Sequence, residues 1–149
     1  MAKIYCASSW RNTHYRDVVK ALLSANHEIW DWRNPPTGGH GFKWQDAGLP
    51  DYAQGAQVHP LAWRHTLKHP GAQAGFASDL AGMNWCSIGV MLHPCGHSAH
   101  LEAGWMAGRG KTVHVLALEP LEPDLMVLAL NGRICISIPE LLSAIGVAA

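Results

Sequence analysis

Glu102 is the side chain whose sequence setting best suits chemistry. It is predicted to lie in the second turn of a helix that starts near Ser98, where free backbone N–H groups and the positive end of the helix dipole favour an ionised carboxylate. Its sequence neighbours Ala99, Leu101, Ala103 and Trp105 are apolar. A carboxylate among apolar residues is costly unless it is paired or functional. A solvated helix glutamate is the commoner alternative, so a functional role needs a more specific signal.

A regular alternation of strands and helices positions this glutamate. Short apolar runs predict strands at residues 3–8, 27–33, 86–92, 112–118 and 133–138, and the run 86–92 is nearly continuous, as in a strand buried on both faces of a parallel sheet. Apolar residues three to four apart predict helices at 12–25, 59–69, 71–83, 98–108, 124–130 and 139–147. This pattern predicts one α/β domain over residues 1–149, with a doubly wound, five-stranded parallel sheet of flavodoxin-like order 2-1-3-4-5 and helices on both faces.

A sheet of this order binds ligands beyond the carboxyl ends of its first and third strands, where the strand order reverses. The first predicted strand runs into Ser8, Ser9 and Trp10, and the third is followed by the turn 93–97 and the helix of Glu102. We therefore expect a crevice lined by serine, tryptophan and histidine side chains and one carboxylate. The turn includes Gly96, and Ser98 is expected to cap the helix.

The composition limits the class of partner. The chain has 149 residues, of which 48% are hydrophobic and only 15% charged, and its 11 basic residues balance 11 acidic ones. The chain thus lacks the excess of basic residues that binds a nucleic-acid polymer or an anionic membrane, so we expect a small-molecule partner. Few charges together with seven tryptophans also favour a homo-oligomer, in which another copy covers apolar surface.

The start of the chain and its cysteines suggest a reducing compartment. Residues 1–5 lead directly into a strand-like run, without the apolar segment and cleavage site of a secretory signal, so we expect a cytoplasmic protein. The four cysteines, Cys6, Cys86, Cys95 and Cys135, form no Cys-x-x-Cys pair. We expect them to be reduced packing residues.

The segment 94–105, Pro-Cys-Gly-His-Ser-Ala-His-Leu-Glu-Ala-Gly-Trp, continues through Gly108, Gly110 and Lys111. It resembles the signature of the nucleoside 2-deoxyribosyltransferase-like family, in which a helix bearing Leu/Met-Glu-x-Gly and then Gly-Lys carries the catalytic glutamate. Three further segments resemble the family in the expected order, and together they span most of the chain: 4–10, with Ile-Tyr and Ala-Ser-Ser-Trp; 79–80, Asp-Leu; and 123–126, Pro-Asp-Leu-Met.

The resemblance implies a role for several residues. Glu102 would be the nucleophile, Tyr5 a phenol that orients it, and Asp79 a group that hydrogen-bonds the nucleobase and assists proton transfer. Asp124, in a segment that also contains Met126, would reach the sugar in a neighbouring subunit, so that active sites are shared. Family members studied in detail have Asp where this chain has Gly96 and Asn where it has Asp124, and both positions are expected to touch sugar hydroxyls.

The implied reaction is N-glycosyl transfer on a nucleoside or deoxynucleoside, exchanging one free nucleobase for another. A carboxylate below the anomeric carbon can stabilise an oxocarbenium-like transition state and then bond to that carbon. An Asp79 that is partly buried, with a raised pKa, would suit the role of proton donor.

Two alternatives remain open. One is a nucleoside 5′-monophosphate N-glycosidase that uses water, for which Ser8, Ser9, Arg11 and Ser98 are the available phosphate anchors. The other is a nucleotide-sensing module without turnover, which would be expected to lack the carboxylates.

Aromatic residues gather in and before a long loop at about 34–57, whose prolines and glycines exclude helix and strand. We interpret this loop as a lid in which Phe42 and Trp44 stack on the base. Trp30 and Trp32 alternate on the second predicted strand, so both are expected to pack on one face. Asp31 and Arg33 would then lie on the other face and contact the base or each other.

The ten histidines raise the question of a metal. His93, Cys95, His97 and His100 lie within eight residues, and His65 and His69 are four apart on a predicted helix. Pro94 and Gly96 prevent a helix from presenting His93 and His97 on one face, and the His65 pair has no nearby third ligand. We therefore expect neither a metal nor another cofactor.

Overall fold

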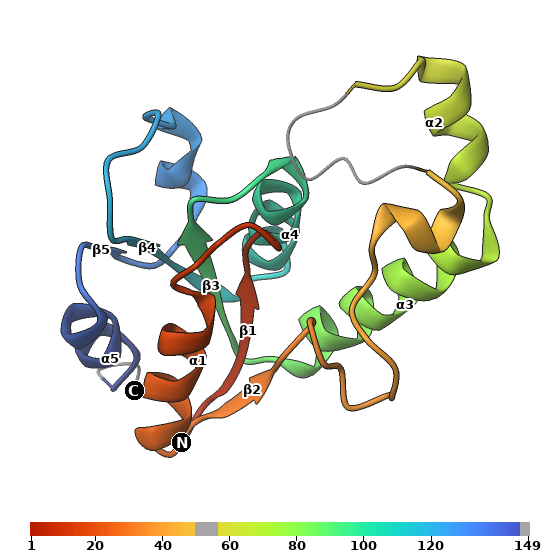
Figure 1. Ribbon diagram of the computed structural model, residues 1–149. Helices are drawn as coiled ribbons and strands as arrows, with labels where there is room; N and C mark the ends of the chain where they lie inside the picture. The colour runs from red at the N-terminus through yellow and green to blue at the C-terminus, as the bar shows by residue number, and fades with distance from the viewer. Residues whose placement is uncertain (50–56, 147–149) are drawn as a thin grey trace.

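Five parallel strands form the centre of the protein. The computed structural model describes residues 1–49 and 57–146, and its sheet has the order β2-β1-β3-β4-β5 (Figure 1). The strands are β1 (Lys3–Ala7), β2 (Glu28–Trp30), β3 (Ile88–His93), β4 (Thr112–Ala117) and β5 (Ile134–Cys135). The predicted α/β fold and the strand order 2-1-3-4-5 are thus confirmed.

The two central strands explain why apolar runs predict them so well. Every residue of β3 is buried, as is every residue of β1 after Lys3, because helices cover both faces of the sheet. The register places Tyr5 beside Gly89 and Cys6 beside Val90. The edge strands β2 and β5 are much shorter than the predicted 27–33 and 133–138, since few of their residues have a partner strand to pair with.

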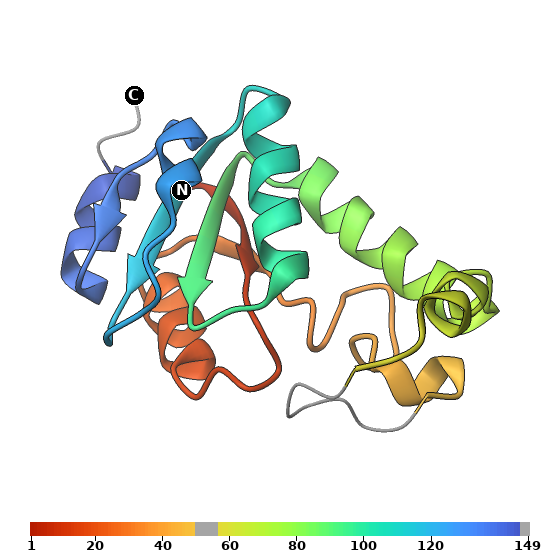
Figure 2. The same cartoon turned by 90° about the horizontal axis from the view of Figure 1, so that it is seen from above.

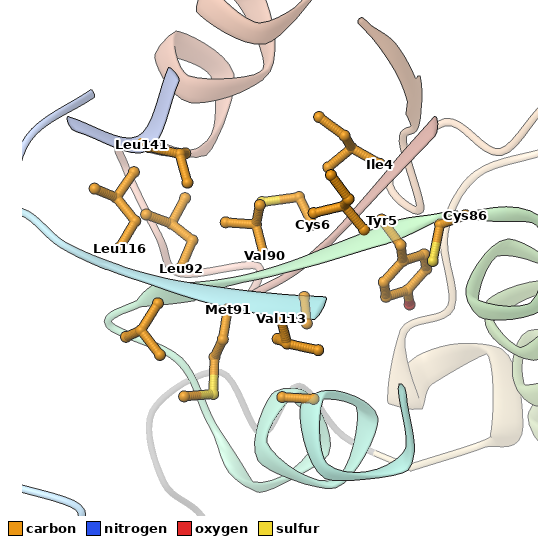
Figure 3. Packing of buried hydrophobic residues seen from close by; sticks show 14 of the residues in the cluster. Ile4, Tyr5, Cys6, Cys86, Val90, Met91, Leu92, Val113, Leu116 and Leu141 are labelled. Atoms are coloured by element: carbon orange, nitrogen blue, oxygen red, sulfur yellow. The ribbon is translucent and has the colours of Figure 1, made fainter. Parts of the chain in front are cut away.

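Helices form a layer on each face of the sheet (Figure 2). The helices α1 (Tyr15–Ser24) and α5 (Ile138–Gly146) pack on one face, and α3 (Pro70–Trp85) and α4 (His97–Gly108) on the other. Figure 3 shows the resulting double core, with Leu92, Leu116 and Leu141 on the α5 side and Met91 and Val113 on the α4 side.

The remaining elements are short. They are the 3₁₀ helices η1 (Trp44–Ala47) and η2 (Leu125–Ala129) and the helix α2 (Pro60–Thr66). The predicted lid at 34–57 is irregular apart from η1 up to residue 49, and its residues 50–56 lie outside the described part of the chain. No helix in the described residues is long and apolar enough to cross a membrane.

Histidine side chains cap two helices, a role that sequence analysis missed. The Nδ1 atom of His59 accepts a hydrogen bond from the backbone N–H of Leu61 at 3.1 Å, ahead of Pro60 at the start of α2. His69 does the same for Gly71 at 3.0 Å at the start of α3. Proline suits the first helical position because it lacks an N–H. Ser98, by contrast, does not cap α4, because the cap position belongs to Gly96.

Trp30 and Trp32 do not share a face, contrary to the sequence prediction. The strand β2 ends at Trp30, which packs on α3 at Gly82 and lies 5.9 Å from Trp85 between ring centroids. Trp32 follows in a turn and packs edge-on to Tyr15 of α1, with a centroid distance of 5.4 Å. The alternation rule fails here because the strand has already ended.

The contact between Gly82 and Trp30 gives a prediction about stability. A Cβ at Gly82 would lie 2.5 Å from the Trp30 ring, so Gly82→Ala is expected to lower the free energy of unfolding by about 1–3 kcal/mol. The control is Gly104→Ala in α4, where a Cβ meets nothing within 4 Å and the helix should gain up to about 1 kcal/mol. Urea denaturation measures both changes, and equal effects at the two sites would contradict the packing described.

Candidate functional site

Three side chains from three different elements come together on the face of the sheet that α3 and α4 cover. Tyr5 comes from β1, Asp79 from α3 and Glu102 from α4. The ring of Tyr5 points to the side of the sheet on which α3 and α4 pack (Figure 3). The charges of Glu102 and Asp79 both raise the pKa of the Tyr5 phenol, so the three groups lie within electrostatic reach of one another. The structure thus brings together the three residues that the sequence pattern singled out, and their catalytic roles stay a prediction.

Tyr5 is held rigidly in this group. Its side chain is only 1% exposed, and burial is the largest cause of its raised pKa. The phenol is therefore a neutral hydrogen-bond donor near neutral pH. It makes a hydrogen bond with Glu102 that lowers the pKa of that carboxyl. A buried tyrosine of this kind orients a carboxyl group without adding charge.

The carboxyl group of Glu102 is partly buried rather than turned into solvent. Burial, followed by the charge of Asp79, raises its pKa to about 8, against the smaller opposing effect of the Tyr5 hydrogen bond. Sequence analysis expected the helix N-terminus to keep this group ionised. Burial instead raises the pKa of this carboxyl, so the helix N-terminus does not keep it ionised at neutral pH.

Asp79 completes a coupled pair of carboxyl groups. It is partly exposed, and burial raises its pKa to about 6, in the direction expected for a proton donor. The charge of Asp79 is the second cause of the raised pKa of Glu102, so the protonation of one carboxyl group affects the other. Between about pH 6 and pH 8 the pair therefore holds one proton, with Glu102 the more basic member.

Asp79 also lines a cavity of about 350 Å³ between α3 and the loop before η1. Neither Tyr5 nor Glu102 lines it. One helical face supplies much of the wall through the small residues Gly71, Ala74, Gly75 and Ser78, and the loop supplies the opposite wall. The Ser78 hydroxyl is buried and has no hydrogen-bond partner among the described residues, so it is available to a polar ligand atom.

The small residues of α3 allow the loop to approach closely. A Cβ on Gly75 would lie 2.5 Å from the Cβ of Phe42, and one on Gly71 would lie 2.5 Å from the backbone oxygen of Asp46. Sequence analysis did not single out these glycines or Ser78. Their spacing of three to four residues along one helix was a usable signal, because it predicts a flat helical face that another segment can contact.

Of the two aromatic residues predicted to stack on a base, Phe42 lines the cavity. Trp44 lies edge-on to it, with a centroid distance of 5.1 Å, and is not itself part of the lining. Trp10 is 38% exposed and donates a hydrogen bond from Nε1 to the Phe42 carbonyl at 2.8 Å, which ties the loop to the end of β1.

Asp31 and Arg33 have structural partners. The Asp31 carboxylate accepts hydrogen bonds from the Tyr15 hydroxyl and from the backbone N–H of Arg33, both at 3.0 Å. The guanidinium group of Arg33 donates to the Ser9 carbonyl at 2.6 Å and stacks 4.1 Å from the Tyr15 ring centroid. These contacts hold the loop after β1 in place. The hydrogen bond between Asp31 and Arg33 uses the backbone N–H of Arg33, not its guanidinium group.

The switch point between β1 and β3 contains a second cavity, of about 230 Å³, lined by Ser9, Arg11, Pro94 and Cys95. Ser8 links the ends of the two strands by donating to the Leu92 carbonyl at 2.9 Å. Ser98 is exposed in the first turn of α4, and a Cβ on Gly96 would meet nothing within 4 Å.

Residues 123–128, named here the C-terminal segment, approach α4 of the same chain at Asp124. Asp124 accepts a hydrogen bond from the backbone N–H of Met126 at 2.8 Å, and its Oδ2 lies 3.6 Å from His100 Nε2. Met126 is 70% exposed. The structure also gathers His93, Cys95 and His100, whose potential metal-ligand atoms lie within 4.8 Å of one another, whereas the exposed His97 is not part of this group.

Solved structures share this fold. The chain is similar to a 2-deoxyribosyltransferase from Bacillus psychrosaccharolyticus, with a TM-score of 0.57 and 20% identity over 95% of this chain and 90% of the other. It is similar to a CMP N-glycosidase from Clostridium botulinum, with a TM-score of 0.53 and 14% identity over 97% and 98% of the two chains. A conserved protein from Enterococcus faecalis gives a TM-score of 0.56 and 15% identity, with 98% of each chain covered.

At the level of the fold, these neighbours support the resemblance to the nucleoside 2-deoxyribosyltransferase-like family. No family model matches the sequence, and no curated protein matches it.

The buried carboxyl of Glu102 should destabilise the fold. Because its folded pKa is raised above the ordinary value of 4.5, the unfolded chain loses this proton first as the pH rises, and stability falls between about pH 4.5 and 8. We expect Glu102→Gln to raise the free energy of unfolding more at pH 7.5 than at pH 4.5, and solvent screening of this partly exposed group keeps the gain to about 1 kcal/mol. Urea denaturation at the two pH values measures this difference. Glu122→Gln, at an exposed position, is the control, and an equal effect there would contradict the burial argument.

Proposed function

We propose that the protein cleaves the N-glycosidic bond of a nucleoside or nucleotide and transfers the sugar to another nucleobase through a bond to Glu102. The observation that carries this proposal is the convergence of Glu102, Asp79 and Tyr5, with both carboxyl pKa values raised. Perturbed carboxyl groups of this kind are typical of catalytic sites. The shared fold with a 2-deoxyribosyltransferase and a CMP N-glycosidase supports the choice of reaction.

The reaction has two steps. The Glu102 carboxylate attacks the anomeric carbon, the bond from that carbon to the base nitrogen breaks, and its electron pair leaves with the base. The departing base takes a proton from Asp79. A second base then attacks the same carbon, displaces Glu102 and returns a proton to Asp79, so the configuration at the sugar is retained. Water in place of the second base gives hydrolysis.

The pair of carboxyl groups supplies the one proton that this reaction needs. In the substrate-free site the proton belongs to Glu102, the more basic member. Substrate binding must therefore shift it to Asp79, which leaves Glu102 as the nucleophile. A sugar that develops positive charge beside Glu102 favours this shift, because it stabilises the ionised carboxylate. The Tyr5 hydrogen bond acts in the same direction.

The nucleobase fits the cavity that Asp79 lines. Phe42 offers an aromatic edge or face there, and the unpartnered hydroxyl of Ser78 offers a polar contact. Asp79 connects this cavity to Glu102. Its side chain lines the cavity, and its charge raises the pKa of Glu102. We infer that the loop before η1 acts as the lid over the base.

A nucleoside 5′-monophosphate N-glycosidase is the second candidate. The cavity at the switch point favours it, because Ser9 and Arg11 both line it and can bind a phosphate group. A binding module without turnover is less well supported, because both carboxyl groups are present and coupled.

We also infer that copies of the chain associate and share active sites through the C-terminal segment. Leu125, Met126 and Leu128 on η2 are 76%, 70% and 79% exposed, and Leu101 on α4 is 75% exposed. Apolar side chains this exposed favour association with another copy. Asp124 at the start of η2 would then lie near the interface.

Product analysis tests the proposed reaction. The protein is incubated with a deoxynucleoside and a second free base, then with the ribonucleoside and with the 5′-monophosphate, and products are separated by chromatography. Base exchange identifies a transferase, and free sugar or sugar phosphate identifies a hydrolase. Glu102→Gln is expected to lose at least about 10³-fold in turnover, because no covalent bond to the sugar can form. Undiminished turnover in this variant would overturn the mechanism.

Asp79→Asn separates the proton donor from the nucleophile. This variant should lose about 10²–10⁴-fold with ordinary nucleosides, the usual contribution of general acid catalysis. The loss should largely disappear with a p-nitrophenyl glycoside, whose leaving group needs no proton. Glu102→Gln should stay inactive on both substrates. An equal loss on both substrates in Asp79→Asn would remove it from the acid role.

The pH dependence of kcat/KM should be bell-shaped. Below about pH 6 both carboxyl groups are protonated and no nucleophile remains, and above about pH 8 both are ionised and no proton donor remains. In Asp79→Asn the pKa of Glu102 should fall, because the charge that helps raise it is gone. The alkaline limb should then vanish, and the one remaining limb should report the Glu102 carboxyl alone, with a pKa between 4.5 and 8. A variant profile identical to that of the natural protein would contradict the coupling.

A further inference from the structure

A compact group of nitrogen and sulfur donors lies at the carboxyl end of β3. His93 is the last residue of this strand, Cys95 follows in the turn, and His100 is in the first turn of α4. Each residue offers one ligand atom, and these atoms all lie within 4.8 Å of one another. His93 is 6% exposed, and Cys95 and His100 are partly buried. The turn after β3 and the start of α4 thus bring the side chains of His93, Cys95 and His100 together.

The distances within this group are close to those around a bound zinc ion. The Sγ atom of Cys95 lies 3.7 Å from His93 Nδ1 and 3.9 Å from His100 Nδ1. Zinc binds sulfur at about 2.3 Å and imidazole nitrogen at about 2.0–2.1 Å, so two such ligands on a tetrahedral ion are about 3.6 Å apart. The two sulfur–nitrogen distances therefore need to shorten by only a few tenths of an ångström to match those around a zinc ion.

Asp124 adds an independent observation. Its Oδ2 lies 3.6 Å from His100 Nε2, the ring nitrogen that faces away from this sulfur contact. A metal-bound histidine usually donates its other N–H to a carboxylate or carbonyl group, which fixes the ring and raises its basicity. The Nδ1 atom of His100 contacts the Gly96 carbonyl at 2.8 Å, and metal binding would replace that contact.

We propose that His93, Cys95 and His100 bind a Zn²⁺ ion through two Nδ1 atoms and one thiolate, with Asp124 orienting His100 from the outside. On binding, the Cys95 thiol gives its proton to solvent and both imidazoles are neutral donors. Thiolate and imidazole together suit zinc, and three protein ligands leave a fourth tetrahedral position for water or a ligand oxygen. The site stands independently of whether Glu102 acts on nucleosides.

The sequence argument against a metal site at residues 93–100 does not apply to His93, Cys95 and His100. Pro94 and Gly96 keep His93 and His97 off one helical face, which is the reason for expecting no metal from the sequence. The group in the structure does not include His97 and combines a strand end, a turn and a helix start. The rule that metal ligands share one face of a helix therefore does not apply to these three residues.

Metal binding by the untagged chain of 149 residues tests the proposal. The metal-free protein, prepared with a chelator, is titrated with Zn²⁺ in competition with a chromophoric chelator, and with Co²⁺ as a spectroscopic probe. We expect one tight zinc site per chain and, with cobalt, a thiolate charge-transfer band together with the visible bands of tetrahedral Co²⁺. Asp124→Asn should weaken zinc binding about 10–100-fold.

Ligand variants and a matched histidine control complete the test. Cys95→Ser and His100→Gln should lose the tight site and the cobalt bands, whereas His97→Gln, which removes an exposed histidine from the same helix, should keep both. Circular dichroism checks that each variant is folded. Zinc should also protect Cys95, the one cysteine that is not fully buried, from thiol reagents. Zinc binding that survives in Cys95→Ser, or that is absent from the folded natural protein, would overturn the proposal.

Discussion

The burial of the Glu102 carboxyl beside Asp79 is the constraint on which the candidate site depends. A carboxyl group in this position loses hydration and meets a like charge, and both effects raise its pKa to about 8. Tyr5, fixed in the buried strand β1, is the one group identified that opposes them by hydrogen bonding. The buried Glu102 carboxylate therefore lowers the stability of the fold, and a positive charge that develops beside it in a reaction would stabilise it.

The central part of this arrangement is predictable from the sequence because it rests on long apolar runs. The strands β1 and β3 are buried on both faces, so apolar runs predict them, and the alternation of strands and helices predicts the sheet order. Edge elements are less predictable. The strand β2 ends at Trp30, and the apparent alternation of the following residues has no structural counterpart, since Asp31 and Arg33 are bound by Tyr15 and by backbone carbonyls.

Contacts between segments distant in sequence account for most of what the sequence did not predict. The pKa of Glu102 depends on its burial and on Asp79, which belongs to another helix. The group of His93, Cys95 and His100 depends on how the turn after β3 enters α4. The cavity beside Asp79 depends on how the loop before η1 packs on α3; the sequence predicted a lid there but not the helix that it faces.

The face of α3 formed by Gly71, Ala74 and Gly75 has a consequence for how such a pocket can change. Because the helix presents almost no side chains there, backbone atoms and the facing loop set the width of the cavity. Replacing single side chains on this face obstructs the loop instead of reshaping the space. New ligand preferences would therefore arise more readily through altered loop length or composition, while the helix that carries Asp79 stays unchanged.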